Sequence, residues 1–164
     1  MSARHRDAGE EDLPAIARIH GHYATHTPAT FDSGALTLEA WTQKWRAAGE
    51  ANHPWLVGEE AGAVFGYAIT GPFRPKDAYF ATVETSIYLG PEAVGRGAGR
   101  ALYEALLAVA AGRGFHVAVA GITLPNGASV ELHEALGFEP VGVFREVGHK
   151  HGDWRDVGFW TLRL

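Results

Sequence analysis

The stretch from Leu89 to Tyr103 reads L-G-P-E-A-V-G-R-G-A-G-R-A-L-Y, an apolar strand followed by a short loop and a helix-forming run. Three glycines and two arginines mark the loop: Gly95, Gly97, Gly99, Arg96 and Arg100. The glycines allow the backbone to approach an anion, and the following helix presents free N–H groups and partial positive charge at the same place. This pattern indicates a phosphate-binding loop, or else a strand-to-helix connection that binds nothing.

Composition limits the class of protein. The chain has 164 residues, enough for one well-filled core and too few for two ordinary domains, so we expect one domain over residues 1–164. Hydrophobic residues make up 46% and charged residues 20%, as in typical soluble proteins. A net charge of −5 argues against nucleic acid or an anionic membrane as partner, because both need a broad basic surface.

Two further features of the sequence restrict chemistry and location. The chain contains no cysteine, which excludes disulfides, thiolate metal sites and an acyl-cysteine intermediate. The first residues, M-S-A-R-H-R-D-A-G-E-E-D, have no apolar core of a signal peptide, and no segment reaches the roughly 18 apolar residues of a membrane helix. We therefore expect a cytoplasmic protein.

The N-terminal half predicts two helices and a hairpin. Apolar spacing favours a helix over residues 10–24, with Pro14 tolerated in its first turn. A second helix follows Thr37, which is a suitable N-cap. Residues 55–59 and 63–70 then read as an antiparallel hairpin.

The next strand, residues 81–89, alternates in polarity. One face carries the polar set Thr82, Glu84, Ser86 and Tyr88, and the other carries Val83, Thr85, Ile87 and Leu89. After the glycine loop we expect a helix that ends near residue 112. One face of this strand is therefore polar enough to form a site.

The remaining elements complete the fold. They are a buried strand at residues 116–122, a short helix at 128–136, and closing strands at 141–147 and 157–164. This order predicts an α/β fold, a mixed central sheet with flanking helices. The strand–helix–strand unit over 81–122 requires parallel strands joined by a right-handed crossover, with the glycine loop at the carboxyl end of the first strand.

Two common nucleotide sites do not fit the loop. A P-loop needs Lys followed by Ser or Thr after its glycines, and neither pair occurs here. A dinucleotide site needs an acidic residue about twenty positions on, yet residues 115–130 contain no Asp or Glu. Kinase, GTPase and nicotinamide chemistry are therefore disfavoured.

The loop resembles the acetyl-CoA pyrophosphate loop of the GCN5-related N-acetyltransferases, whose form is [QR]-x-x-G-x-[GA]. Residues 94–99 match its glycines and depart at Val94. A second family motif is matched downstream by Asn126, Ser129, His133 and the pair Gly137-Phe138. Positions 126, 129 and 133 also share one helix face.

Longer stretches resemble the branch that acetylates phosphinothricin and methionine sulfoximine. They are V-E-T-S-I-Y at 83–88, L-P-N at 124–126, L-H-E-A-L-G-F at 132–138 and K-H-G-D-W-R-D-V-G-F-W at 150–160. The resemblance spans nearly the whole chain. It implies N-acetylation of the α-amino group of a glutamate-like small molecule by acetyl-CoA, in a homodimer whose cleft lies near the subunit interface.

The resemblance assigns roles to particular residues. Glu84 is the expected catalytic base, because the acceptor amine must lose a proton before it attacks the thioester. His133 holds the position at which many relatives carry a proton-donating tyrosine, and it could act as acid or as base. With no cysteine, we expect direct transfer in a ternary complex.

Binding residues follow in the same way. The backbone of Ile87, Tyr88 and Leu89 should pair with the pantetheine arm, Asn126 and Ser129 should contact it, and residues 95–100, including Ala98, should hold the pyrophosphate. Asn126 could instead be only the N-cap of its helix. Substrate contacts are expected from Arg74, Tyr23, Phe31, Thr85 and Ser86.

Alternatives at this stage are a non-catalytic acyl-CoA-binding module on the same fold and an acetyltransferase for a polyamine or a protein N-terminus. Two His-x-His pairs, His20 with His22 and His149 with His151, raise the question of a metal. Neither pair has a third ligand at an informative spacing, so we expect no metal.

Overall fold

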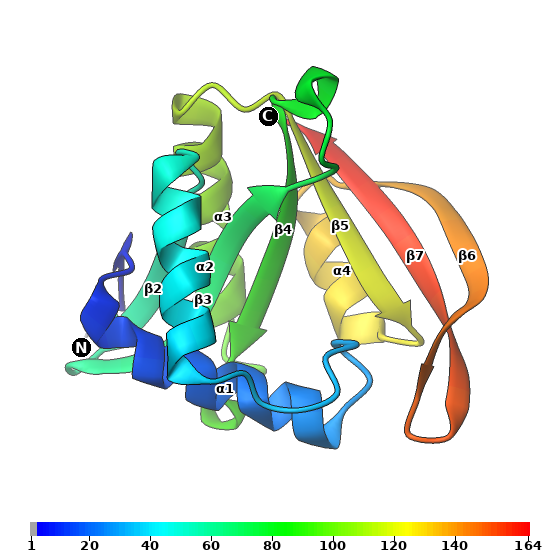
Figure 1. Ribbon diagram of the computed structural model, residues 1–164, viewed down its shortest axis with the longest axis horizontal. Helices are drawn as coiled ribbons and strands as arrows, with labels where there is room; N and C mark the ends of the chain where they lie inside the picture. Colours follow the sequence, from blue (N-terminus) through cyan, green and yellow to red (C-terminus); the bar gives the residue numbers. More distant parts are fainter. Residues whose placement is uncertain (1–2) are drawn as a thin grey trace.

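The computed structural model describes residues 3–164 and contains one seven-stranded sheet in the order β1-β2-β3-β4-β5-β7-β6. The strands are β1 (Arg4–Asp7), β2 (Trp55–Glu60), β3 (Ala63–Pro72), β4 (Thr82–Leu89), β5 (Val117–Leu124), β6 (Glu139–Lys150) and β7 (Asp153–Arg163). Only β4 and β5 are parallel among neighbours, and the helix between them makes the crossover. The predicted mixed α/β sheet is confirmed (Figure 1).

Four helices cover the two faces of the sheet: α1 (Leu13–His26), α2 (Leu38–Glu50), α3 (Ala98–Gly112) and α4 (Gly127–Ala135). In Figure 1, α1 and α2 lie in front of the sheet, and α3 and α4 lie behind it. Short 3-10 helices are η1 (Glu10–Asp12), η2 (Asp77–Tyr79) and η3 (Pro91–Ala93). Thr37 caps α2 as expected, because its Oγ1 accepts from the Ala40 N–H at 3.1 Å.

Strand alternation divides the apolar residues between two cores. On the front face Ile16 and Ile19 of α1 and Trp41 of α2 pack against the sheet with Val57 and Tyr67. On the back face, α3 buries side chains against the alternate strand residues; the set includes Leu102, Leu106, Leu56, Ala68, Val83 and Ala118. Neighbouring residues of one strand thus serve opposite cores.

The boundaries differ from the sequence expectations at three places. Strand β1 is missing from the predicted elements, since its four residues, R-H-R-D, are all polar or charged and carry no apolar pattern. The first helix is split into η1 and α1. Strands β6 and β7 extend to a turn at residues 151–152, beyond the apolar runs that predicted them, because pairing between the two strands continues through polar residues.

Candidate functional site

A cleft opens on the front face over β3 and β4. Its floor follows the strand register, in which Tyr67 lies opposite Tyr88, Ile69 opposite Ser86, and Gly71 opposite Glu84. The cavity has a volume of ≈ 620 Å³. Residues of α1, α2 and the segment between them form its walls. The polar face expected on residues 81–89 thus lines a cavity.

Glu84 is the central carboxylate of this cleft. Burial raises the pKa of its carboxyl above the ordinary value, and the positive charge of Arg74 opposes that rise. A carboxylate with a raised pKa is a better proton acceptor than an exposed one. Arg74 itself stacks over the Phe73 ring, 4.5 Å from its centroid, and is not among the residues lining the cleft.

The cleft wall contains a close polar contact between α1 and the following segment. His20 Nε2 lies 2.9 Å from Asp32 Oδ2, and His20 is 4% exposed. Its ring packs edge-on against Trp41 and Tyr88. Burial lowers the pKa of His20, while the Asp32 charge opposes that change, and burial raises the pKa of Tyr88 to about 12.

Two buried donors of the cleft residues lack partners within residues 3–164: Trp41 Nε1 and the Tyr67 hydroxyl. Burial also raises the pKa of Tyr67, so the phenol keeps its proton. Buried polar groups without partners are uncommon in folded proteins. Five residues that line the cleft were not predicted from the sequence: Trp41, Tyr67, His20, Asp32 and Lys44. For Tyr67 a signal was available, because strand alternation places it on the same face as Ile69.

Strands β4 and β5 separate beside the cleft. They pair only from Thr82 to Glu84, against residues 117–119, whereas β5 continues along β7 to Leu124. Figure 1 shows the two strands converging at one end and splaying at the other. The β5-facing backbone edge of residues 85–89 therefore has no strand partner in the described chain, as the expected pairing of Ile87, Tyr88 and Leu89 with a ligand requires.

The glycine loop lies at the splayed end of β4 and leads into α3. Gly95 and Gly97 adopt φ of +79° and +76°, a region that glycine enters without strain, and Gly97 is the N-cap of α3. Arg96 and Arg100 are exposed; Arg96 lies 3.6 Å from Glu60, and Arg100 forms a surface ion pair with Glu104 at 2.9 Å. Gly99 is buried against Leu89 and Ile87, whereas the preceding loop residues face solvent.

Asn126 and Ser129 lie at the start of α4. The Asn126 side chain accepts from the Ser129 N–H at 3.2 Å, so the N-cap role is present in the structure. The Ser129 carbonyl accepts from His133 Nδ1 at 2.7 Å. Asn126 and Ser129 are thus joined to His133 through one turn of helix.

His133 is buried, at 4% exposed, and both of its ring nitrogens are engaged. Since a carbonyl only accepts, Nδ1 carries the proton toward Ser129, and neutral Nε2 accepts from the Tyr103 hydroxyl at 3.0 Å. The Tyr103 oxygen in turn lies 2.6 Å from Thr85 Oγ1. Burial lowers the pKa of His133, and the bond to the Ser129 carbonyl opposes that change.

This network corrects the expectation for Thr85. Its side chain lies on the back face of β4, is 5% exposed, and contacts Tyr103 and the Val119 carbonyl. The expected place of Thr85 in the acceptor cleft is wrong, because strand alternation directs it away from Glu84 and Ser86. His133 lies on this back side as well and does not line the cleft.

The other expected substrate residues lie around the cleft. Ser86 lines it. Tyr23 stacks near Tyr88 and donates from its hydroxyl to the Leu89 carbonyl at 2.7 Å. Phe31, which is 44% exposed, packs against Gly148 of β6. The structure therefore brings Glu84, Ser86 and Tyr88 together in the cleft and leaves Arg74, Tyr23 and Phe31 at its margin.

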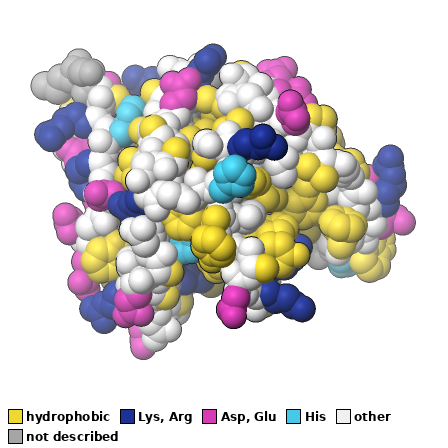
Figure 2. All heavy atoms as spheres, turned by 90° about the horizontal axis from the view of Figure 1, so that it is seen from above, with side chains coloured by type: hydrophobic (Ala, Val, Ile, Leu, Met, Phe, Trp, Pro, Cys, Tyr) yellow, Lys and Arg dark blue, Asp and Glu magenta, His cyan; other side chains and the backbone are white. Residues whose placement is uncertain are grey.

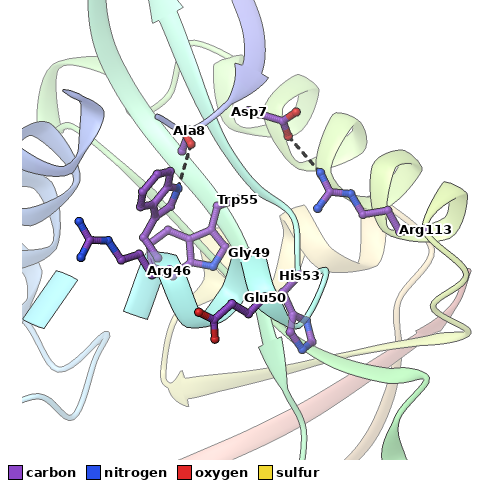
Figure 3. Close-up of a pocket in the computed structure, with 9 residues that line it drawn as sticks. Asp7, Ala8, Arg46, Gly49, Glu50, His53, Trp55 and Arg113 are labelled. Atoms are coloured by element: carbon purple, nitrogen blue, oxygen red, sulfur yellow. Dashed lines mark hydrogen bonds and ion pairs between the residues drawn. The ribbon is translucent and has the colours of Figure 1, made fainter. Parts of the chain in front are cut away.

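A second cavity of ≈ 410 Å³ adjoins the first, since His53 and Trp55 line both. Figure 3 shows Arg46, Glu50 and Arg113 around it, with Arg113 bonded to Asp7. None of the expected site residues lies there. In residues 3–164 no helix is long and apolar enough to cross a membrane, and no three His, Asp or Glu side chains gather as metal ligands do.

Comparison with known proteins agrees with this geometry. Residues 16–138 match the model of the acetyltransferase (GNAT) family. The chain is 39% identical over 163 residues to the phosphinothricin N-acetyltransferase of Streptomyces coelicolor, covering 97% of this chain and 95% of the relative. It is 40% identical over 168 residues to the L-methionine sulfoximine/L-methionine sulfone acetyltransferase of Pseudomonas aeruginosa, covering 100% and 96%.

A solved structure gives the same result. An acetyltransferase from Salmonella typhimurium, solved with acetyl-CoA, superposes with a TM-score of 0.97 at 37% identity, covering 100% of this chain and 95% of that one. The family match spans most of the chain, and the relatives are similar over nearly their whole length. This chain therefore belongs to the GNAT family of acetyltransferases.

Proposed function

We propose that residues 1–164 form one catalytic domain that transfers the acetyl group of acetyl-CoA to the α-amine of a small amino-acid analogue such as phosphinothricin or methionine sulfoximine. The observation that carries the proposal is the meeting of two features at β4: the free backbone edge of residues 85–89 and the cleft carboxylate of Glu84. One strand thereby serves two ligands, with the thioester arm along its edge and the amine over its front face.

The residues support a direct transfer. Glu84 removes a proton from the acceptor ammonium, directly or through water, and the neutral amine attacks the thioester carbonyl. A backbone N–H of residues 87–89 polarises that carbonyl. The C–S bond then breaks, giving the amide and CoA thiolate, which takes up a proton. His133 is the proposed source of that proton or a second base, and it is hydrogen-bonded to the back face of β4 through Tyr103 and Thr85.

Support for the co-substrate comes from the loop and from the relatives. Residues 95–100 offer glycine backbone at positive φ and two exposed arginines at the N-terminus of α3, features that suit a pyrophosphate. Asn126 and Ser129 are the proposed pantetheine contacts at the start of α4. The Salmonella relative was solved with acetyl-CoA. The chemistry needs no metal.

The test is an acetyl-transfer assay. Purified protein is mixed with acetyl-CoA and either L-phosphinothricin or L-methionine sulfoximine, and free thiol and acetylated product are both measured. Glu84→Gln is the matched variant. Thiol release that requires the acceptor and falls in the variant supports the proposal. Tight CoA binding without transfer to any amine of a broad panel would instead indicate a non-catalytic acyl-CoA-binding module.

A second class of acceptor is favoured by one observation. Asp32 and Glu84 both line the cleft, so two carboxylates face the acceptor. A cationic acceptor, such as a polyamine or a peptide N-terminus, would be attracted by them, whereas Lys44 in the cleft and Arg74 near Glu84 favour an acidic one. Including spermidine and a short peptide in the acceptor panel separates these classes by kcat/KM.

The proposed assembly is a homodimer. Strands β6 and β7 expose several large apolar side chains: Val141, Val143, Phe144, Val147 and Trp154. Large exposed apolar groups on neighbouring strands are typical of protein interfaces. Figure 2, which views the molecule from above Figure 1, shows hydrophobic side chains on this face beside basic and histidine ones, with further charged side chains around its edge. Light scattering during size-exclusion chromatography distinguishes a dimer from a 17.6 kDa monomer.

A further inference from the structure

Lys150, the last residue of β6, is a buried lysine with no part in the reaction described above. It is 8% exposed, and its Nζ donates to the Ala24 carbonyl at 2.7 Å and to the Thr30 carbonyl at 2.6 Å. Ala24 lies in the last turn of α1, where carbonyls have no helical N–H partner and a cation is favoured by the helix dipole. Lys150 therefore joins the end of β6 to the end of α1 and to the segment after it.

That segment, residues 27–37, forms one wall of the cleft. Thr30 and Asp32 both line the cavity. Thr30 Oγ1 donates to Asp32 Oδ2 at 3.4 Å and accepts from the Asp32 N–H at 3.3 Å, and Asp32 is paired with His20. The carbonyl that Lys150 holds thus belongs to the residue that orders Asp32.

Gly148 provides a second contact between β6 and this segment. A Cβ added at Gly148 would overlap the ring of Phe31, so the ring lies directly on the strand backbone. Phe31 stands between Thr30 and Asp32 in the sequence. Two alternate residues of β6 therefore contact Thr30 and Phe31, the two residues that precede Asp32.

We propose that Lys150 is a positioning residue for the acceptor cleft, fixing residues 27–37 through the Ala24 and Thr30 carbonyls while Gly148 seats Phe31. The proposal rests on the acetyltransferase function proposed above. Burial of an ammonium is unfavourable unless its donors find acceptors, and here two carbonyls accept from two of its three N–H groups. Burial lowers the pKa of Lys150, and the charge of Asp32 opposes that change.

The first test is a separation of kinetic constants in Lys150→Met, which keeps the apolar stem and removes the charge. We expect the acceptor KM to rise about tenfold, since charge-assisted hydrogen bonds order the wall, with the acetyl-CoA KM unchanged. Lys76→Met removes an exposed lysine and is the control for net charge. An unchanged acceptor KM, or equal losses for both substrates, overturns the proposal.

The second test restores the ammonium chemically. Because the chain has no cysteine, Lys150→Cys introduces a single thiol, and 2-bromoethylamine converts it to a close analogue of lysine. Labelling is carried out in denaturant and followed by refolding. We expect the aminoethylated protein to recover the acceptor KM and the iodoacetamide-treated protein, which carries a neutral group, to remain impaired. Equal behaviour of the two adducts overturns the proposal.

A third readout is independent of activity. Hydrogen exchange of residues 27–37 should be faster in Lys150→Met and in Gly148→Ala, with exchange of α3 unchanged. If no acceptor is acetylated by the unmodified protein, the proposed function fails while this measurement still tests the role of Lys150. Should Lys150→Met not fold, Gly148→Ala alone decides, because unchanged exchange of 27–37 in that variant contradicts the positioning of this segment by β6.

Discussion

The Tyr103 hydroxyl offers a sharp test of the buried network behind β4. Tyr103 is 0% exposed, and its oxygen joins Thr85 Oγ1 at 2.6 Å to His133 Nε2 at 3.0 Å. Tyr103→Phe removes one atom and keeps the ring, which also packs against Phe138. The change therefore isolates the two hydrogen bonds from the packing of the core.

The expected cost follows from the partners that remain. Thr85 keeps the Val119 carbonyl as an acceptor at 3.3 Å, whereas His133 Nε2 loses its only donor in a buried place. One orphaned buried acceptor costs about 1–3 kcal/mol of unfolding free energy. For a chain of this size that corresponds to a fall in Tm of about 2–12 °C.

The assay is urea unfolding followed by circular dichroism, with thermal melting in parallel. Tyr79→Phe is the control, because Tyr79 is 42% exposed and its loss should change the unfolding free energy by less than about 0.5 kcal/mol. If Tyr103→Phe is as stable as the unmodified protein, the hydrogen-bond chain from Thr85 to His133 does not exist as described. A changed pH profile of kcat/KM in the same variant would further link this chain to His133.

Three other predictions follow from the site. Glu84→Gln should lower kcat/KM by about 10²- to 10⁴-fold, because it removes the proposed base. The same variant should be more stable near neutral pH, because burial raises the pKa of Glu84 and so disfavours its charged form in the folded state. A lower unfolding free energy in urea contradicts this. Burial lowers the pKa of His20, His53 and His133, so the unfolded chain binds protons at a higher pH than the folded protein does. The unfolding free energy should therefore decline as pH falls below about 6.5. An unfolding free energy that stays constant from pH 7 to 5 contradicts this. Gly97→Ala places a Cβ on a residue with φ of +76°, which costs about 1–2 kcal/mol, and it should weaken CoA binding measured by calorimetry. Gly49→Ala is the control, because Gly49 lies within α2 with open space around it, and CoA binding should be unchanged.

Most of the fold is readable from local patterns. Thr37 marks the start of α2, the glycine loop separates β4 from α3, and Gly137 follows α4 with a φ of +92°. These signals depend on residues that are close in sequence. Strand β1 was not predicted because its partners in β2 lie 49 to 55 positions away in the sequence, and nothing within Arg4–Asp7 indicates that pairing.

The site was only partly predictable. Alternation along β4 identified Glu84 and Ser86 as cleft residues and should also have excluded Thr85. The contributions of Asp32 and Trp41 depend on how α1, α2 and their connection lie over the sheet, which is a matter of tertiary packing. The burial of His133 has the same origin, since Tyr103 comes from a different helix.

The separation of β4 from β5 has a consequence for the mechanics of the molecule. Among the described residues, three pairs of β4 and β5 and the adjoining bonds to the Ala81 carbonyl join β1–β4 to β5–β7 within the sheet. The backbone is therefore nearly two sheets that meet along a short line of pairing. A ligand arm that pairs with β4 in this gap would act as a missing strand and brace that line of pairing. Co-substrate binding should therefore raise resistance to unfolding across both halves, beyond the residues that it touches.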